Sequence, residues 1–382
     1  LEQRESDLRL EIDWASFRWL PSDVFGPGKV MVSTYILDRD GQPYHADTRG
    51  LLREFTNRLA AEKSWVPEAA FEIEGFLFQG VDAEQRFRPH EGFQFVSEGG
   101  YFHSLPLTPL KQFIDRLAEA QRALGFENEK DHPEVAPSQF ELNYSYCQAL
   151  VAADQVQLYK MVARQIAASM GHTASFLPKP RTNINGSGMH TNISITEKGR
   201  NLIHDGSDPD GLSPLARQMV QRLLQTATDM CLVMNPSVNA YRRLDPAYEA
   251  PNQIRASAVD RSAMIRIPLG TEKSARLEVR SVGPDANPYL LLLALFRSAL
   301  NGPVGPEADG QLVLPDNIHD AIEAFANSQA MAELMGAECR DKYAVLKMAS
   351  SNRCPKELGS RIKSGEVLFH HEVTNQQLWG QF

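Results

Sequence analysis

The sequence predicts a large soluble fold of mixed helices and strands, and three observations support this prediction. The 382 residues are 42% hydrophobic and 23% charged, which is the balance of a globular protein with a sizeable core. Short segments with alternating apolar residues, such as 140–146, recur along the chain and are typical of strands. Between them lie segments with apolar residues three and four positions apart, which are typical of amphipathic helices.

Charge and cysteine content exclude several classes of protein. The net charge is −9 and no long basic run occurs, which argues against nucleic acid or an anionic membrane as the main partner. The longest apolar run, 290–296, ends at Arg297 and is too short to span a bilayer. The four cysteines form no CxxC motif and the first residues do not resemble a signal peptide, so we expect free thiols and a cytoplasmic location. No Walker A pattern occurs, and Gly186-x-Gly188 lacks the third glycine of a dinucleotide-binding fingerprint.

In the first half of the chain, strands and helices are expected in alternation. The turn signal Asp40-Gly41 follows the first strand, and Gly171 is typical of the residue after a helix. The expected strands are 30–37, 71–78 and 140–146, and the expected helices are about 48–61, 110–124 and 152–170.

In the second half, two helix starts carry a capping residue followed by proline, Ser213-Pro214 and Asn287-Pro288. Residues 235–268 predict an irregular segment rich in arginine, and residues 276–280 alternate as a strand. The expected helices are about 214–234, 288–300, 317–328 and 330–349.

The stretch Asn185–Ser194 (NGSGMHTNIS) is the first candidate site. Its two glycines allow a tight turn and the close approach of a ligand to the backbone. If the following run is a strand, His190, Asn192 and Ser194 point to one face. Taken alone, the stretch also fits an ordinary hairpin with a solvated face.

Two pairs of glutamates strengthen the site. Glu72 and Glu74 would share one face of a strand with Cα atoms about 6.6 Å apart, where two carboxylates repel unless a cation or proton lies between them. Glu134 and Glu141 are separated by an odd number of positions, but Pro137-Ser138 indicates a bend that lets them converge. A solvent-facing edge is the alternative for the first pair, although two phenylalanines on the same face argue against it.

Together these segments predict a site with two cations and a nucleotide. Five glutamates with one histidine suit Mg²⁺ or Mn²⁺ better than zinc, and burying them without metal would be costly. The arginines between 242 and 280 offer forked donors for phosphate oxygens, so the set fits phosphoryl transfer. Scattered salt bridges are the alternative, and for any single arginine they are the better interpretation.

The motifs, in this order, resemble the glutamine synthetase family of the bacterial type. NGSGMH at 185–190, preceded by FLPKP at 176–180, matches a motif of that family, and the resemblance covers nearly the whole chain from about residue 8. It implies an α+β fold in which a curved, mainly antiparallel sheet forms an active-site funnel flanked by helices. Residues 1–40 would be a remnant of, or connection from, a small N-terminal sheet domain, and 41–382 the catalytic domain. Further motifs match at 235–244, 248–251, 261–268, 276–280 and 285–290.

The resemblance implies a role for each matching residue. The ligands of a first cation would be Glu74, Glu134 and Glu141, and those of a second cation Glu72, His190 and Glu278. Glutamate would be bound by Asn185, Gly186, Arg243 and Arg280, with Tyr101 near the acceptor. The ATP phosphates would contact Arg261, Arg266 and Arg276, with Ser194 and Asn192 also on the ATP side. Glu249 would close the site and take a proton from the incoming nitrogen, and Arg243 and Arg261 would assist the reaction.

The implied reaction forms γ-glutamyl phosphate from glutamate and ATP, and a nitrogen nucleophile then displaces phosphate. The family's ammonium-binding loop lies before the matching part of this chain, so we expect an organic mono- or polyamine as acceptor. The alternatives are authentic glutamine synthetase, which uses ammonia, and a non-catalytic structural homologue. All six cation positions keep a competent side chain, which argues against the structural homologue. Asn192 stands where the family commonly has a second histidine, and one six-membered ring or two stacked rings are the expected assembly.

Overall fold

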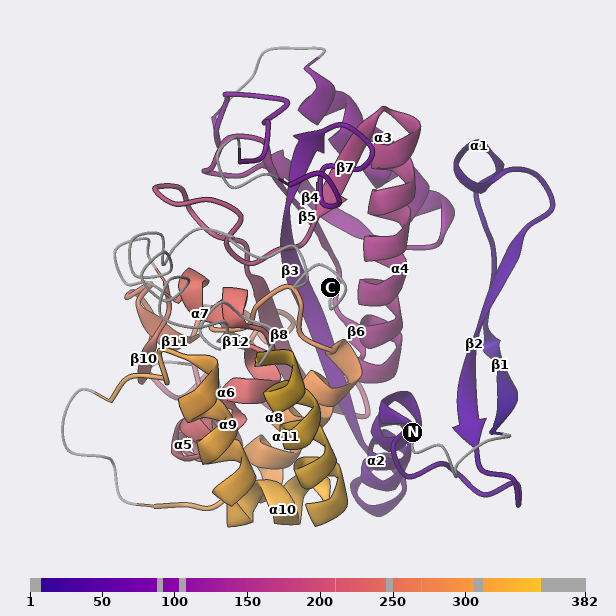
Figure 1. The fold of residues 1–382 in the computed structure, drawn as a ribbon. Coiled ribbons are helices and arrows are strands. Elements are labelled where there is room, and N and C mark those ends of the chain that lie inside the picture. Colours follow the sequence, from indigo (N-terminus) through magenta and orange to yellow (C-terminus); the bar gives the residue numbers. More distant parts are fainter. Residues whose placement is uncertain are drawn as a thin grey trace.

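The 15-residue strand β3 (Trp65–Gln79) lies at the centre of the main sheet of the computed structural model (Figure 1). The structure describes residues 8–87, 92–102, 108–209, 211–244, 250–268, 270–305 and 312–351. The ten-stranded sheet has the order β10-β11-β12-β8-β3-β5-β4, with β6 and β7 paired to β3 and β9 paired to β8. Among the described strands only β10 and β11 pair in parallel, so the predicted, mainly antiparallel sheet is confirmed. The strands beside β3 are β4 (Asn128–Pro133), β5 (Gln139–Tyr144), β6 (Cys147–Gln148), β7 (His172–Ser175), β8 (Met189–Glu197), β9 (Arg200–Asn201), β10 (Gln253–Ser257), β11 (Ala263–Arg266) and β12 (Leu277–Val279).

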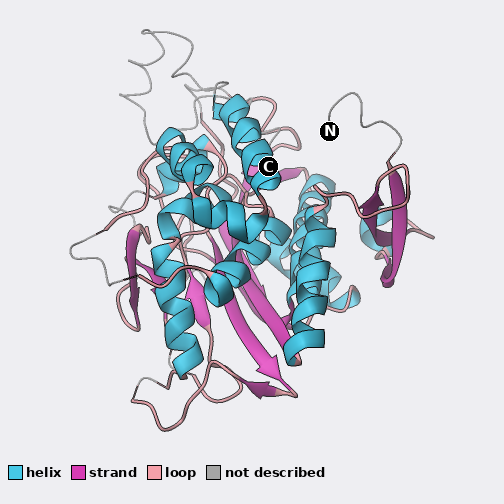
Figure 2. Cartoon of the chain, turned by 90° about the horizontal axis from the view of Figure 1, so that it is seen from below, coloured by secondary structure: helices cyan, strands magenta, loops and turns pink. Residues whose placement is uncertain are grey.

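The two faces of β3 differ in character because its side chains alternate. Ala69, Phe71 and Ile73 are buried in the main core, whereas Glu72 and Glu74 on the opposite face are partly exposed. The helices α2 (Thr48–Lys63) and α4 (Ala149–Ser169) pack against β3, and α8 (Pro288–Asn301) packs against both of them. Figure 2 shows the helices gathered around the sheet. The apolar face therefore anchors the strand, and the polar face is left for the site.

The remaining helices complete the core. Helix α3 (Pro109–Ala123) packs on α4 and on β4, and α5 (Pro214–Gln225) packs on α8. No helix among the described residues is long and apolar enough to cross a membrane. The others are α1 (Ser22–Phe25), α6 (Ala227–Met234), α7 (Val238–Arg243), α9 (Ile318–Asn327), α10 (Gln329–Met335) and α11 (Ala337–Ser351).

Three expectations about the second half of the chain are wrong. The segment 235–268 is not irregular, because it contains α7, β10 and β11. Helix α7 begins directly after the expected break, since Ser237 caps it by accepting a hydrogen bond from the amide of Ala240 (3.3 Å). The helix expected over 214–234 is interrupted at Thr226, and the helix expected over 330–349 is interrupted at Gly336, which has φ of 90°.

Strands β1 (Arg9–Trp19) and β2 (Val30–Leu37) form a two-stranded sheet of their own, beside the main body (Figure 1). A lone two-stranded sheet is marginal in water, so it needs contacts to the body. Arg49 of α2 supplies them, because its Nη2 lies 2.7 Å from Asp13 of β1 and 2.7 Å from Asp154 of α4. Tyr35 of β2 donates a hydrogen bond to the same Asp13 (2.9 Å).

Arg49→Met should loosen this small sheet without loosening the main sheet. Removing one member of a largely buried ionic network costs roughly 2 kcal/mol or more, so amide exchange in β1 and β2 should quicken at least about tenfold. Arg58→Met is the matched control on the same helix, since Arg58 is exposed and lies beside Leu300 and Asn301 of α8. Arg53 is unsuitable as a control, because it stacks on Tyr35 of β2 at 3.4 Å from the ring centroid. Equal effects of the two substitutions on exchange would contradict the anchoring role of Arg49.

Candidate active site

The register of the central strands brings acidic side chains together from distant parts of the sequence. Glu72 of β3 lies opposite His190 of β8, and Glu74 of β3 lies opposite Glu141 of β5. On the other side of β8, Glu278 of β12 lies opposite Asn192. The polar face expected for residues 190–194 therefore faces carboxylates and not bulk solvent.

One group of possible cation ligands, the Glu72 cluster, consists of Glu72, His190 and Glu278. One ligand atom from each lies within 4.8 Å of the others. Nδ1 of His190 is 3.6 Å from Glu72 and 4.0 Å from Glu278. Glu278 is fully buried, and Arg266 (3.3 Å) and Arg280 (3.2 Å) offset its charge. The structure thus brings together the three residues that we assigned to the second cation.

A second group, the Glu141 cluster, consists of His132, Glu134 and Glu141, again within 4.8 Å. The bend at Ser138, where φ is 58°, makes the two glutamates converge as expected. His132 was not foreseen, because its place opposite Glu141 depends on the register of β4 on β5. Glu74 does not belong to this group. Its Oε2 accepts hydrogen bonds from the amide of Gly188 (2.9 Å) and from Nε2 of Gln139 (3.2 Å).

The carboxylates of the Glu141 cluster resist ionisation. Burial first, and then the neighbouring Glu74, raise the pKa of Glu141 to about 9. Burial and Glu74 likewise raise the pKa of Glu134 to about 7. For Glu72 burial also opposes ionisation, but contacts with His190 and Asn192 outweigh it and lower the pKa to about 2. A hard cation would relieve the repulsion, and each cluster offers carboxylates with one imidazole, a donor set that fits Mg²⁺ or Mn²⁺.

The raised pKa values predict that Mg²⁺ stabilises the protein more strongly at high pH. Without a cation, the raised pKa of Glu141 means that the folded state loses stability as pH rises from the ordinary 4.5 towards about 9. A cation replaces the proton, so the rise in melting temperature on adding Mg²⁺ should be larger at roughly pH 8.5 than at roughly pH 6.

Thermal unfolding with and without Mg²⁺ at both pH values measures this difference. The substitution Glu141→Gln should make the Mg²⁺ shift smaller and less dependent on pH, because the amide does not titrate. An equal Mg²⁺ shift at both pH values in the unsubstituted protein would contradict the electrostatic account.

The glycine loop 185–188 makes room for a buried arginine. A Cβ on Gly186 would lie 2.9 Å from Cγ of Arg243, and one on Gly188 would lie 2.5 Å from its Nη2. Nη2 donates to the carbonyl of Arg280 (3.1 Å), but the buried Nη1 has no hydrogen-bond partner in the described part of the chain. Burial lowers the pKa of Arg243 to about 10, so the group stays charged at neutral pH. An unpaired buried cationic donor beside a glycine loop fits an anionic ligand such as a carboxylate.

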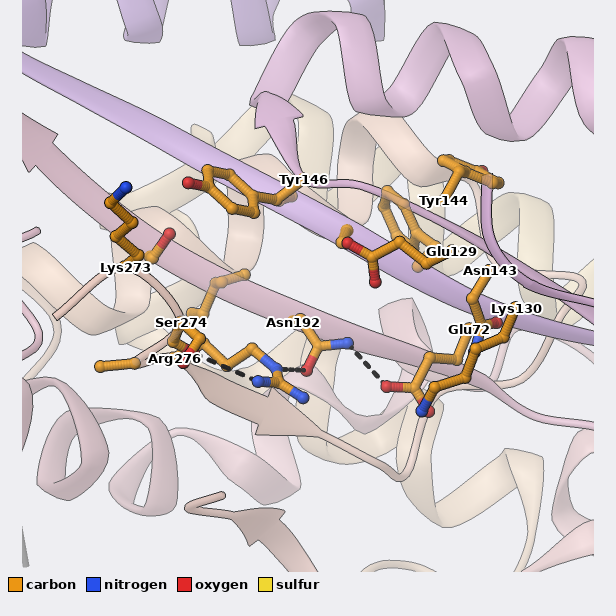
Figure 3. Close-up of a pocket in the computed structure, with 16 residues that line it drawn as sticks. Glu72, Glu129, Lys130, Asn143, Tyr144, Tyr146, Asn192, Lys273, Ser274 and Arg276 are labelled. Atoms are coloured by element: carbon orange, nitrogen blue, oxygen red, sulfur yellow. Dashed lines mark hydrogen bonds between the residues drawn. The ribbon is translucent and has the colours of Figure 1, made fainter. Parts of the chain in front are cut away.

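A cavity of about 180 Å³ opens beside the Glu72 cluster, between β3, β5 and β8 (Figure 3). A row of hydrogen bonds crosses it. Nδ2 of Asn192 donates to Glu72 (3.0 Å), while Oδ1 of Asn192 accepts from Arg276 (2.9 Å). Arg276 also donates to the carbonyl of Ser274 (3.1 Å), as Figure 3 shows. The lining includes Ser194 and the aromatic ring of Tyr146, so the cavity combines a positive charge with an apolar wall.

The other predicted residues surround these features. The ring of Tyr101 stands edge-on to His132 with centroids 5.1 Å apart, which places it beside the Glu141 cluster. Arg261 is exposed, and its carbonyl accepts a hydrogen bond from Arg280. Asn185 lies in the glycine loop and is partly buried. Glu249, expected to close the site, lies outside the described residues.

Comparison with known proteins identifies the family. A profile described as "Glutamine synthetase, catalytic domain" matches residues 45–360. The chain belongs to the glutamine synthetase family. Among its relatives is a glutamine synthetase of Thermotoga maritima, which is 34% identical over 89% of this chain and 80% of the relative. Another is a glutamine synthetase of Thermus thermophilus, which is 35% identical over 87% of this chain and 78% of the relative. The solved structure "Apo GmaS without ligand" has a TM-score of 0.77 and 27% identity, covering 92% of this chain and 82% of that one.

The predicted family, fold and enzyme class are therefore confirmed: this glutamine synthetase homologue is an ATP-dependent ligase that forms a C–N bond. The family's use of ATP and divalent metals agrees with the two carboxylate clusters. The roles of individual residues, the division near residue 40 and the ring assembly stay predictions.

Proposed function

We propose that the protein joins the γ-carboxylate of glutamate to the nitrogen of an organic amine through γ-glutamyl phosphate formed from ATP. The observation that carries the proposal is the convergence of the Glu72 and Glu141 clusters beside Arg243, whose buried Nη1 has no hydrogen-bond partner in the described part of the chain. This arrangement supports two cations next to a binding site for a carboxylate. The neighbouring cavity with Arg276 supports an adjacent nucleotide.

In this proposal different residues bind glutamate, stabilise the transferred phosphoryl group and accept a proton. Arg243 binds a carboxylate of glutamate and leaves its γ-carboxylate near the Glu141 cluster. Arg266 and Arg276 bind phosphate oxygens with their forked donors and stabilise charge on the transferred group. Bound cations would neutralise phosphate oxygens during the transfer. By resemblance, Glu249 accepts the proton that the attacking nitrogen loses, and closure over the site excludes water.

Two observations favour an organic amine as the acceptor, and one favours ammonia. The structural neighbours entitled GmaS, a γ-glutamylmethylamide synthetase, share 26–27% identity with this chain and support an alkylamine. The aromatic Tyr101, 46% exposed beside the Glu141 cluster, also suits an alkylammonium ion. Ammonia is the second candidate, because the curated relatives at 33–35% identity are named glutamine synthetase.

Phosphate release with ATP, Mg²⁺ and glutamate tests the acceptor directly. Methylamine, longer monoamines, diamines and polyamines are compared with ammonia at equal concentrations of the free base. We expect at least one organic amine to give kcat/KM about tenfold or more above that of ammonia, a preference worth about 1.4 kcal/mol. Turnover with ammonia alone would contradict the amine acceptor but leave the ligase chemistry intact.

Asn192→Leu tests the nucleotide side. It removes the amide that links Glu72 to Arg276, so the KM for ATP should rise about tenfold while the KM for glutamate stays within about twofold. Thr196→Val is the matched control, because Thr196 lies on the same face of β8 but outside the cavity. An increase in the KM for glutamate as large as that for ATP would show that Asn192 does not act on the nucleotide side.

A further inference from the structure

The turn between β4 and β5 contains a buried residue in a backbone conformation that disfavours it. Ser138 has φ of 58° and no exposed surface. A residue with a Cβ in the left-handed region costs roughly 1 kcal/mol relative to glycine. The side chain offsets this cost, because Oγ accepts hydrogen bonds from the amides of Val96 (2.8 Å) and Ser97 (2.8 Å) and donates to the carbonyl of Ser97 (3.1 Å).

Gln139, the next residue, makes its contacts with a different segment. Nε2 lies within hydrogen-bond distance of the carbonyl of Gly186 (3.0 Å), Oγ of Ser187 (3.3 Å) and Oε2 of Glu74 (3.2 Å). Its Oε1 accepts from the amide of Ala136 (3.2 Å), which keeps the amide group from rotating. Gln139 is only 1% exposed, so these contacts are made away from water.

The segment held by Ser138 leads to the acceptor side. It begins with Phe93, which stacks on Phe78 at a centroid distance of 4.3 Å, and it ends at Tyr101 beside His132. Near its end it runs so close to the turn that a Cβ on Gly100 would lie 2.9 Å from the carbonyl of Val135. Residues 92–101, here called the acceptor loop, therefore lie against the β4–β5 turn.

We propose that Ser138 and Gln139 are positioning residues that fix the two substrate loops against one hairpin. Ser138 holds the acceptor loop, and Gln139 holds the glycine loop 185–188. The same hairpin carries Glu134 and Glu141, so it sets the separation between the glutamate side and the nitrogen side of the site. The assignment of each loop to a substrate rests on the proposed function.

The substitution Ser138→Gly removes the side-chain hydrogen bonds without adding backbone strain. Glycine relieves the strain at positive φ, so the variant should fold, and it removes all three hydrogen bonds to the acceptor loop. We expect faster hydrogen exchange of the Val96 and Ser97 amides and a KM for the amine, or for ammonia, about three- to tenfold higher. The KM for glutamate should change less than about twofold, because Gln139 is untouched.

Gln139→Met, of similar volume, is the matched variant on the other side. It should raise the KM for glutamate about three- to tenfold while leaving exchange at Val96 and Ser97 unchanged. If Gln139→Met fails to fold, Ser138→Gly alone decides the role of Ser138.

Two outcomes would overturn the proposal. In the first, Ser138→Gly leaves both the hydrogen exchange of the Val96 and Ser97 amides and the KM for the amine unchanged. In the second, either variant raises the KM for the amine and the KM for glutamate equally. If the unsubstituted protein shows no glutamate-dependent turnover, the proposed function fails on its own. The exchange measurement then still tests the positioning, and unchanged exchange in Ser138→Gly would contradict it.

Discussion

Repulsion between carboxylates on one face of the central sheet is the constraint on which the rest of the site depends. Glu72 and Glu74 alternate with core residues of β3, and the strands on either side add Glu141 and His190 at the directly opposed positions. Backbone pairing fixes these side chains a few ångströms apart, so they cannot move away from one another. Each must be compensated by a proton, an arginine, hydrogen bonds or a cation. The raised pKa of Glu141 is the consequence where no arginine of the described residues forms an ion pair with the carboxylate.

Groups from the surrounding chain compensate the charges of these carboxylates. On the Glu278 side, Arg266 and Arg280 supply positive charge directly. On the Glu74 side, an amide of the glycine loop and the Gln139 side chain supply hydrogen bonds. The Glu141 cluster has no ion pair with an arginine in the described part of the chain. Hydrogen bonds from Asn143 to Glu141 (2.8 Å) and from the amide of Val135 to Glu134 (3.0 Å) leave both pKa values raised, so a divalent cation has the most to contribute here. The glycine loop helps to compensate the charge of Glu74. In our proposal the same loop contacts glutamate, so the contacts that fix the loop also fix part of the substrate site.

Much of this was accessible from the sequence, because the motifs lie on regular elements. The 190–194 alternation, the glutamate pair in β3 and the strand at 276–280 follow from periodicity alone, and the structure brings Glu72, His190 and Glu278 together as expected. His132 and Gln139 were missed, because their contacts depend on strand register and loop packing that no local pattern encodes. The order in 235–268 was missed as well, since a serine cap and two short strands give a weak signal beside many arginines.

The central claim is that the two clusters bind two divalent cations, and counting bound Mn²⁺ tests it most directly. Electron paramagnetic resonance of free Mn²⁺ in an equilibrium titration gives the number of ions bound per chain. We expect two ions per chain for the unsubstituted protein, and one each for Glu278→Gln and Glu134→Gln, because each substitution disables a different cluster. Fewer than two ions in the unsubstituted protein, or two ions still bound by either variant, would contradict the claim.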